Sequence, residues 1–282
     1  MGTIKRIICI LIIGALGIYF ISTSDFYQVL DPRTLARRVL SKEFIEHQYR
    51  DLITQNSMEQ VDEWIDMSES QDFSYYGDNT CPPNKYRWKL KKILRRWDNI
   101  AKKNNITYSL TCGTLLGAWR TGDLVPLDAD LDVLISAKDN WKLDRIKEKN
   151  LNFNNHDGKY HLYLQRDWQQ PYEGRGRYLC NGQKTTNYKD QCSFIEPLGR
   201  LMRFGTHVDI YDYTVRDGLL IDPSEGYHEL KIEDIFPLKK CMFLDMEMKC
   251  SNKPKVHLES FYSNLKPNKI CVNGSWVKMN DA

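Results

Sequence analysis

A periodic apolar stripe marks the first helix that the sequence predicts within a folded domain. Between residues 85 and 103, apolar positions recur at intervals of three or four, and lysines and arginines fill most of the other positions. The basic positions indicate a solvated helix face or, alternatively, a face that attracts an acidic glycan or a membrane surface. The apolar stripe consists of Leu90, Ile93, Leu94, Trp97, Ile100 and Ala101.

After this helix, apolar and polar positions alternate in short segments, which is typical of β-strands. Such segments occur at 106–110 and 131–135, with a turn and a short helix at 112–120 between them, and again at 160–164 and 207–211. Strands mixed with helices favour an α/β or α+β fold.

An apolar run near the N-terminus predicts a membrane-targeting segment. The run extends from Ile7 to Ile21, follows Lys5-Arg6 and precedes a polar stretch. Its length as a helix, about 22 Å, is short for a plasma membrane but sufficient for a thinner bilayer. We expect an uncleaved signal anchor that leaves the following residues in the lumen of the Golgi or endoplasmic reticulum. A cleaved signal peptide, which would release a secreted protein, is the alternative.

The composition predicts three regions along the chain. Residues 1–24 would form a cytosolic tip and the signal anchor, and the polar, helix-compatible residues 25–80 would form a stem. Glycine and proline near residue 80 mark a boundary, so residues 81–282 are expected to form one lumenal catalytic domain. The net charge of +3 is too small for 282 residues to indicate a nucleic-acid partner.

The cysteines support an oxidising compartment. All of them except Cys9 lie beyond the predicted anchor, and their number there is odd, so at least one cannot pair within the chain. A structural zinc site is the alternative, although the sequence has no Cys-x-x-Cys pair. Short spacing favours the disulfides Cys180–Cys192 and Cys241–Cys250. The first would close the long polar loop 169–192, which we expect to bind substrate.

Three aspartates conflict with strand composition in the segment 126–133. Asp128, Asp130 and Asp132 alternate with apolar residues, so a strand would place the carboxylates together on one face. Two like charges about 4 Å apart repel by roughly 4 kcal/mol at an effective dielectric of 20, and a divalent cation would reverse that sign. Carboxylate oxygens suit Mg²⁺ or Mn²⁺. The alternative is a set of solvated aspartates at the mouth of the strand. An EF-hand is excluded, because its glycine and terminal glutamate are absent.

Two other features extend this candidate site. Gly113-Thr114 stands where a strand ends and a helix begins, and backbone N–H groups at such a position bind phosphate, unobstructed by a glycine side chain. Asp209 alternates with Val208 and Ile210 and would supply a further metal ligand or a general base. The combination of a small dipeptide, an acidic pair and a later third acid resembles the nucleotidyltransferase superfamily.

A longer match narrows this resemblance. The run Gly-Thr-Leu-Leu-Gly-Ala-Trp-Arg at 113–120, continued by the aspartates at 128–132, resembles the LicD family, which includes bacterial phosphocholine transferases and the animal fukutin and fukutin-related proteins. Residues 207–210 are similar to the family's third-acid strand, and residues 235–262 to its C-terminal segment. The family often has tryptophan and a further acid around the aspartates, where this chain has leucine and alanine. These departures spare the presumed ligands but could alter the choice of donor.

The resemblance implies an α+β fold with a nucleotidyltransferase-like mixed β-sheet flanked by helices, preceded here by the membrane anchor and a helical stem. It also implies a phosphotransferase. Mg²⁺ or Mn²⁺ would bind the diphosphate of a CDP-linked donor, and a phosphocholine- or ribitol-phosphate-like group would pass to a glycan or glycoprotein with release of CMP. The residues implied are Asp130, Asp132 and Asp209 for the metal, and Gly113, Thr114 and Arg120 for the donor phosphates. For Arg120, a structural salt bridge is the alternative.

Two other functions are compatible with the sequence. A metal-dependent glycosyltransferase that uses a nucleotide sugar can share the anchor and the acidic-x-acidic motif. Such enzymes usually place a full nucleotide-binding βα unit before the acids, whereas here a single short helix separates the Gly-Thr turn from them. A non-catalytic lumenal scaffold would retain the fold, although the acidic residues are complete in this chain.

Overall fold

The computed structural model divides the chain into two units, Met1–Leu52 and Ile53–Ala282. The structure describes residues 12–14, 17–19, 63–68, 70, 76–77, 80–149, 157–224 and 227–279. In the first unit these form an antiparallel pair, β1 (Ile12–Gly14) and β2 (Gly17–Tyr19). The rest of the predicted signal anchor and most of the predicted stem lie outside the described residues. None of the described helices is both long enough and apolar enough to cross a bilayer.

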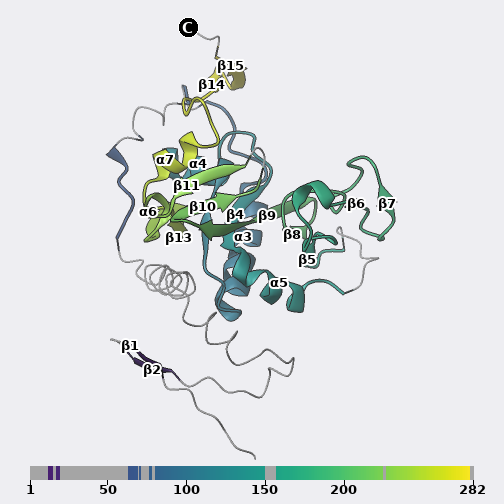
Figure 1. Ribbon diagram of the computed structural model, residues 1–282. Helices are drawn as coiled ribbons and strands as arrows, with labels where there is room; N and C mark the ends of the chain where they lie inside the picture. Colours follow the sequence, from purple (N-terminus) through teal and green to yellow (C-terminus); the bar gives the residue numbers. More distant parts are fainter. Residues whose placement is uncertain are drawn as a thin grey trace, which may run out of the picture. The chain divides into compact units, whose positions relative to one another are not determined.

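The second unit contains helices and strands that alternate irregularly along the chain (Figure 1). Its helices are α3 (Arg87–Lys103), α4 (Cys112–Thr121), α5 (Asn140–Ile146), α6 (Ile232–Ile235) and α7 (Pro254–Glu259), with 3-10 turns η3 (Ala137–Asp139) and η4 (Tyr172–Gly174). Its strands are β3 (Tyr108–Leu110), β4 (Leu131–Ser136), β5 (His161–Leu164), β6 (Arg177–Tyr178), β7 (Lys184–Thr185), β8 (Gly199–Arg203), β9 (Thr206–Arg216), β10 (Leu219–Asp222), β11 (His228–Lys231), β12 (Lys239–Phe243), β13 (Met246–Cys250), β14 (Lys269–Val272) and β15 (Ser275–Lys278).

A mixed seven-stranded sheet is the centre of this unit. Its main path runs β11-β10-β9-β4-β3, with β8 and then β5 added beside β9. The pair β4 and β9 is parallel, and the other pairs are antiparallel. This arrangement confirms the expected α+β fold with a mixed sheet. The first predicted strand is shorter than expected, because the turn that ends α3 extends to Ile106, whose N–H donates to the carbonyl of Ala101.

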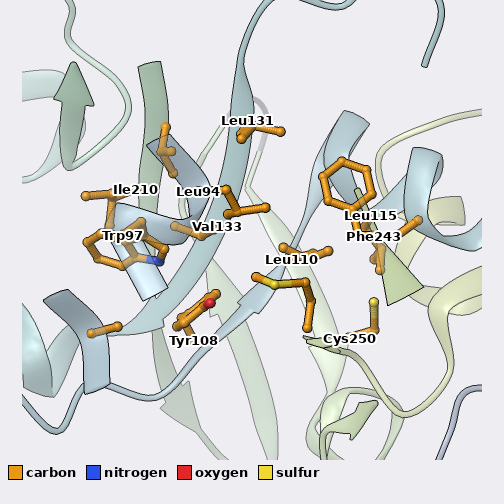
Figure 2. Close-up of a cluster of buried hydrophobic side chains, with 14 of the residues drawn as sticks. Leu94, Trp97, Tyr108, Leu110, Leu115, Leu131, Val133, Ile210, Phe243 and Cys250 are labelled. Carbon is orange, nitrogen blue, oxygen red and sulfur yellow. The ribbon is translucent and has the colours of Figure 1, made fainter. Parts of the chain in front are cut away.

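The long helix α3 covers one face of the sheet. Its apolar stripe is buried as predicted, except that Ile100 is only partly buried, and Figure 2 shows Trp97 beside Val133 and Ile210. Burying side chains of this size contributes about 1.5–3 kcal/mol each. Because side chains alternate along a strand, anchoring Val133 and Ile210 under α3 forces their neighbours Asp132 and Asp209 onto the opposite face. The core therefore determines which way the acids point.

Helix α4 packs too closely against the following loop for any residue but glycine at position 117. A Cβ atom on Gly117 would lie 2.4 Å from the carbonyl oxygen of Asp123 and 3.1 Å from the backbone nitrogen of Val125. The neighbouring residues of the Leu-Leu-Gly-Ala-Trp-Arg run are all buried. The close packing of this run therefore holds the loop that carries the aspartates directly against the helix.

We expect Gly117→Ala to destabilise the protein by about 1–3 kcal/mol, because the backbone must shift to admit the methyl group. Urea denaturation would measure the loss. Gly174→Ala is the matched control, since its Cβ would approach nothing closer than 3.5 Å. Equal stability of the two variants would contradict the close packing described here.

In the described part of the second unit, three disulfides join segments that lie outside the seven-stranded sheet. The predicted pairs Cys180–Cys192 and Cys241–Cys250 are confirmed, and a third joins Cys81 to Cys271. The third pair is 190 residues apart in sequence, so no local spacing indicated it. Cys112 is the cysteine in the described residues that lies outside any disulfide.

Short pieces of the predicted stem belong to this unit and contact its later strands. The N–H of Ile65 donates to the carbonyl of Lys240, and Ile65 is buried in the core. The carbonyl of Tyr76 accepts from the N–H of Cys271 beside the Cys81–Cys271 disulfide. The chain just before residue 80 is thus tied to strands near the C-terminus.

Candidate metal centre

The acidic residues converge because two parallel strands begin side by side. Asp132 of β4 lies directly opposite Asp209 of β9, on the face that α3 leaves uncovered. Asp130 precedes β4, and His207 occupies the second position of β9. The Nε2 atom of His207 is 3.4 Å from Oδ2 of Asp130 and 3.6 Å from Oδ1 of Asp209. One ligand atom from each of these three residues lies within 4.8 Å of the others, so they could share one ion.

The carboxylates of this cluster raise the free energy of one another's charged form. Burial raises the pKa of Asp132 well above its usual value, and the charges of Asp130, Asp209 and Asp128 add to the effect. Burial, followed by the charge of Asp130, raises the pKa of Asp128 to about 7. The pKa of Asp130 is lowered instead, chiefly by the side chain of His207. Such crowding is costly in a bare protein, and a divalent cation would offset it.

Asp209 is held by an arginine from the neighbouring strand. Arg200 of β8 donates from Nε to Oδ1 of Asp209 at 2.6 Å and from a terminal nitrogen to Oδ2 at 3.0 Å, and both side chains are buried. Burial raises the pKa of Asp209, and the charge of Arg200 opposes that rise. The guanidinium also donates to the hydroxyl of Tyr188 and the carbonyl of Gln191, in the loop closed by Cys180–Cys192. Through Arg200, this loop fixes the orientation of Asp209.

The Gly113-Thr114 turn lies against the same carboxylates. The backbone N–H of Asp132 donates to the hydroxyl of Thr114 at 2.7 Å, which fixes the start of β4 to the first turn of α4. A Cβ atom on Gly113 would lie 3.1 Å from Oδ2 of Asp128 and 3.7 Å from Oδ2 of Asp132. The absence of a side chain at Gly113 therefore keeps the space between the helix and the acids open.

A cleft of about 780 Å³ opens beside these residues. Its lining includes the Gly113 turn, the three aspartates Asp128, Asp130 and Asp132, and a C-terminal wall from residues 261–264, 266, 268 and 269 that bears Lys266 and Lys269. Asp209 and His207 are not among its lining residues. Arg120 is largely buried and also lines the cleft, and it donates to the carbonyl of Leu265 and, at 3.2 Å, to the hydroxyl of Tyr76. The contact with Leu265 attaches the C-terminal wall to α4, and the contact with Tyr76 attaches the chain before residue 80.

Sequence reasoning did not single out four residues that shape this site. His207 carried a usable signal, since it stands two positions before Asp209 and a strand places both on one face. Arg200, Lys266 and Lys269 carried none, because strand pairing brings the first to the site and a distant disulfide fixes the segment that bears the other two.

The chemistry of the donor set fits a divalent cation. Carboxylate oxygens of Asp130 and Asp209 and the imidazole of His207 lie within reach of one ion, and the strand register puts Asp132 opposite Asp209 as a further carboxylate. Such oxygens suit Mg²⁺ and Mn²⁺. Within the described part of the chain, both ring nitrogens of His207 are shielded from solvent and make no hydrogen bond. A bound ion would give this buried ring a partner.

Comparison with known proteins agrees with the geometry. An uncharacterised protein of Rickettsia prowazekii (strain Madrid E), RP689, is 39% identical over 57 residues, which is 20% of this chain and 21% of that relative. The chain thus matches about a fifth of the length of that protein. A family model described as "LicD/FKTN/FKRP, nucleotidyltransferase domain" matches residues 105–253, which include every one of the aspartates described above. Because this match spans more than half of the sequence, the chain belongs to the LicD/FKTN/FKRP family of nucleotidyltransferase domains, whose members are generally phosphotransferases.

Proposed function

We propose that this protein transfers a phospho-alcohol, such as a phosphocholine- or ribitol-phosphate-like group, from a CDP-linked donor to a glycan in the secretory pathway. The observation that carries the proposal is the cleft itself, whose lining combines the carboxylates of Asp128, Asp130 and Asp132 with a wall that bears Lys266 and Lys269. A metal-bound diphosphate is the kind of ligand that satisfies both parts of this lining, because the metal neutralises the carboxylates and the lysines attract the phosphates. Family membership supports a transferase of this type.

The residues around the cleft would divide the work. Asp130, Asp132 and Asp209 would hold Mg²⁺ or Mn²⁺, which when bound supplies charge neutralisation for the donor diphosphate. Arg200 keeps the carboxylate of Asp209 in a fixed orientation.

The phosphates would also meet groups of the protein. The open first turn at Gly113 would present backbone N–H groups to a phosphate oxygen. Arg120 holds the lysine-bearing wall at a fixed distance from the acids, which supports the phosphates indirectly.

The disulfides indicate a secretory or lumenal compartment for this domain. We place the protein at the Golgi or endoplasmic reticulum membrane through the N-terminal segment, with the catalytic domain lumenal and with secretion after signal cleavage as the alternative. The acceptor would then be a glycan or glycoprotein of the same compartment.

A thermal-shift screen of the full chain with CDP-, UDP- and GDP-linked donors, with and without Mg²⁺ or Mn²⁺, tests the donor class without knowledge of the acceptor. We expect stabilisation by CDP-linked polyols or aminoalcohols only with metal present, followed by CMP release when a glycan acceptor is added. Selective stabilisation by UDP- or GDP-sugars would favour a glycosyltransferase instead. If no nucleotide bound under any condition, a non-catalytic scaffold would replace the proposal.

A further inference from the structure

We infer that His207 is a direct ligand of the metal ion, and that the site therefore selects Mn²⁺ or another transition-metal ion over Mg²⁺. The inference deepens the proposed function, on which it rests, because it specifies the ion at the same site. It is carried by the position and the surroundings of the His207 ring rather than by the sequence pattern that pointed to the aspartates.

The ring of His207 lies in the middle of the acidic cluster. Its Nε2 atom faces Asp130 and Asp209 at 3.4 and 3.6 Å, and the side chain is only 13% exposed. Within the described part of the chain, neither ring nitrogen makes a hydrogen bond. Among the described residues, Nδ1 thus has no partner and Nε2 has only the two long ion-pair contacts. Leaving a buried polar group poorly satisfied costs about 1–3 kcal/mol, so this arrangement requires an explanation.

A second histidine shows what an ordinary ion pair looks like in this protein. His161 also lies between two carboxylates, with one ring nitrogen 3.0 Å from Glu148 and the other 3.0 Å from Asp157. Those contacts are hydrogen bonds of normal length. His207 uses one nitrogen toward both of its carboxylates and stops short of either.

The longer separations at His207 match atoms that share an ion. Two ligand atoms about 2.1 Å from one metal ion, at an angle of about 90–110°, stand about 3.0–3.4 Å apart. The observed distances of 3.4 and 3.6 Å are at or just beyond the upper end of that interval. Only a small inward movement of the side chains is needed for all three ligand atoms to coordinate one ion.

A nitrogen ligand changes the choice of metal. Mg²⁺ prefers oxygen ligands and retains several waters, whereas transition-metal ions bind imidazole readily. Among the divalent first-row transition metals, Mn²⁺ generally binds such sites most weakly. A preference for Mn²⁺ over Mg²⁺ is therefore a conservative test, because the other metals of the series should bind more tightly than Mn²⁺.

The test uses the full chain without donor and the metals alone as probes. Isothermal titration with Mn²⁺ and with Mg²⁺ gives the two affinities, and pulsed electron paramagnetic resonance of bound Mn²⁺ reports whether a nitrogen coordinates it. We expect the wild type to favour Mn²⁺ and to show nitrogen coupling. In His207→Gln, Mn²⁺ affinity should fall about 10–100-fold and Mg²⁺ affinity by less than about threefold, with the coupling lost.

His161→Gln is the matched control, because it removes a histidine from between two carboxylates elsewhere and should leave both the coupling and the Mn²⁺ preference intact. Melting curves of each variant separate loss of a ligand from loss of the fold. If His207→Gln melts early, the nitrogen coupling of the wild type alone decides the question.

The outcomes separate this inference from the proposed function. Bound Mn²⁺ without nitrogen coupling, in a protein that still releases CMP, would overturn the role of His207 and leave the transferase standing. Nitrogen-coupled Mn²⁺ in a protein that accepts no CDP-linked donor would do the reverse. Absence of any metal binding would refute both.

Discussion

Replacing Asp132 with asparagine is expected to stabilise the metal-free protein while abolishing its transferase activity. In the folded protein, burial and the charges of Asp130, Asp209 and Asp128 raise the pKa of Asp132 well above its usual value. A carboxyl whose pKa is raised on folding weakens the folded state once it ionises, so at neutral pH the neutral amide should be the more stable side chain. We expect a gain of about 1 kcal/mol, or roughly 2–4 °C in melting temperature for a domain of this size.

The effect of Asp132→Asn on stability should reverse when metal is present, so that the variant becomes less stable than the wild type. The wild type gains stability from the ion, whereas Asp132→Asn loses a ligand and should gain little. Activity should fall at least about 1,000-fold, equivalent to about 4 kcal/mol of transition-state stabilisation. Melting curves with and without Mn²⁺ and a CMP-release assay would measure both effects.

Glu247→Gln is the matched control, since Glu247 is an exposed strand carboxylate paired with Lys240 outside the cleft. It should change neither the response to metal nor the activity. A metal-free Asp132→Asn protein that is less stable than the wild type would show that this carboxylate is required by the fold itself.

Side-chain alternation predicts the part of the site that lies on strands. It predicted one shared face for Asp128, Asp130 and Asp132, but β4 begins at Leu131, so only Asp132 lies on the strand, and Asp128 and Asp130 lie in the loop that leads into it. For Asp132 the structure shows why the predicted face is correct. Apolar neighbours such as Val133 are anchored under α3, so the strand can face only one way. The side chain of Asp209 could be assigned to the same face for the same reason once its strand was recognised.

The residues that the sequence did not reveal depend on pairings that no pattern indicated. Arg200 lies on β8 directly opposite Asp209 of β9 in a short hairpin, and the sequence predicted no strand at 199–203. The lysine-bearing wall of the cleft depends on the Cys81–Cys271 disulfide, whose partners are 190 residues apart. No propensity or periodicity indicates such contacts.

The motif that carried the family resemblance also has a different physical role from the one that its position suggested. The residues from Leu115 to Arg120 are buried, and Gly117 is required by close packing rather than by a ligand. Arg120 is expected to support phosphates, and it lines the cleft while it donates to the carbonyl of Leu265 and the hydroxyl of Tyr76. The motif therefore contributes Gly113, Leu116 and Arg120 to the lining of the cleft, and its other residues pack behind that lining.

Replacing Arg200 with methionine is expected to destabilise the metal-free protein by about 3–5 kcal/mol. Arg200 and Asp209 are both buried, and removing one partner leaves the other as an uncompensated buried charge. Urea denaturation would measure the loss. Arg87→Met is the matched control, because Arg87 pairs with Asp123 and Asp245 at partly exposed positions, where the loss should stay below about 1 kcal/mol.

Two additions distinguish a structural pair from a pair that serves the metal. The double variant Arg200→Met with Asp209→Asn should recover most of the lost stability, since no unpaired charge remains, but it should stay inactive. Mn²⁺ should rescue the single variant Arg200→Met, because the cation replaces the missing positive charge beside Asp209, and it should not rescue the double variant. If Mn²⁺ stabilised the two variants equally, Asp209 would not be a metal ligand, and the ion would have to be held by the acids of the segment 128–132 alone.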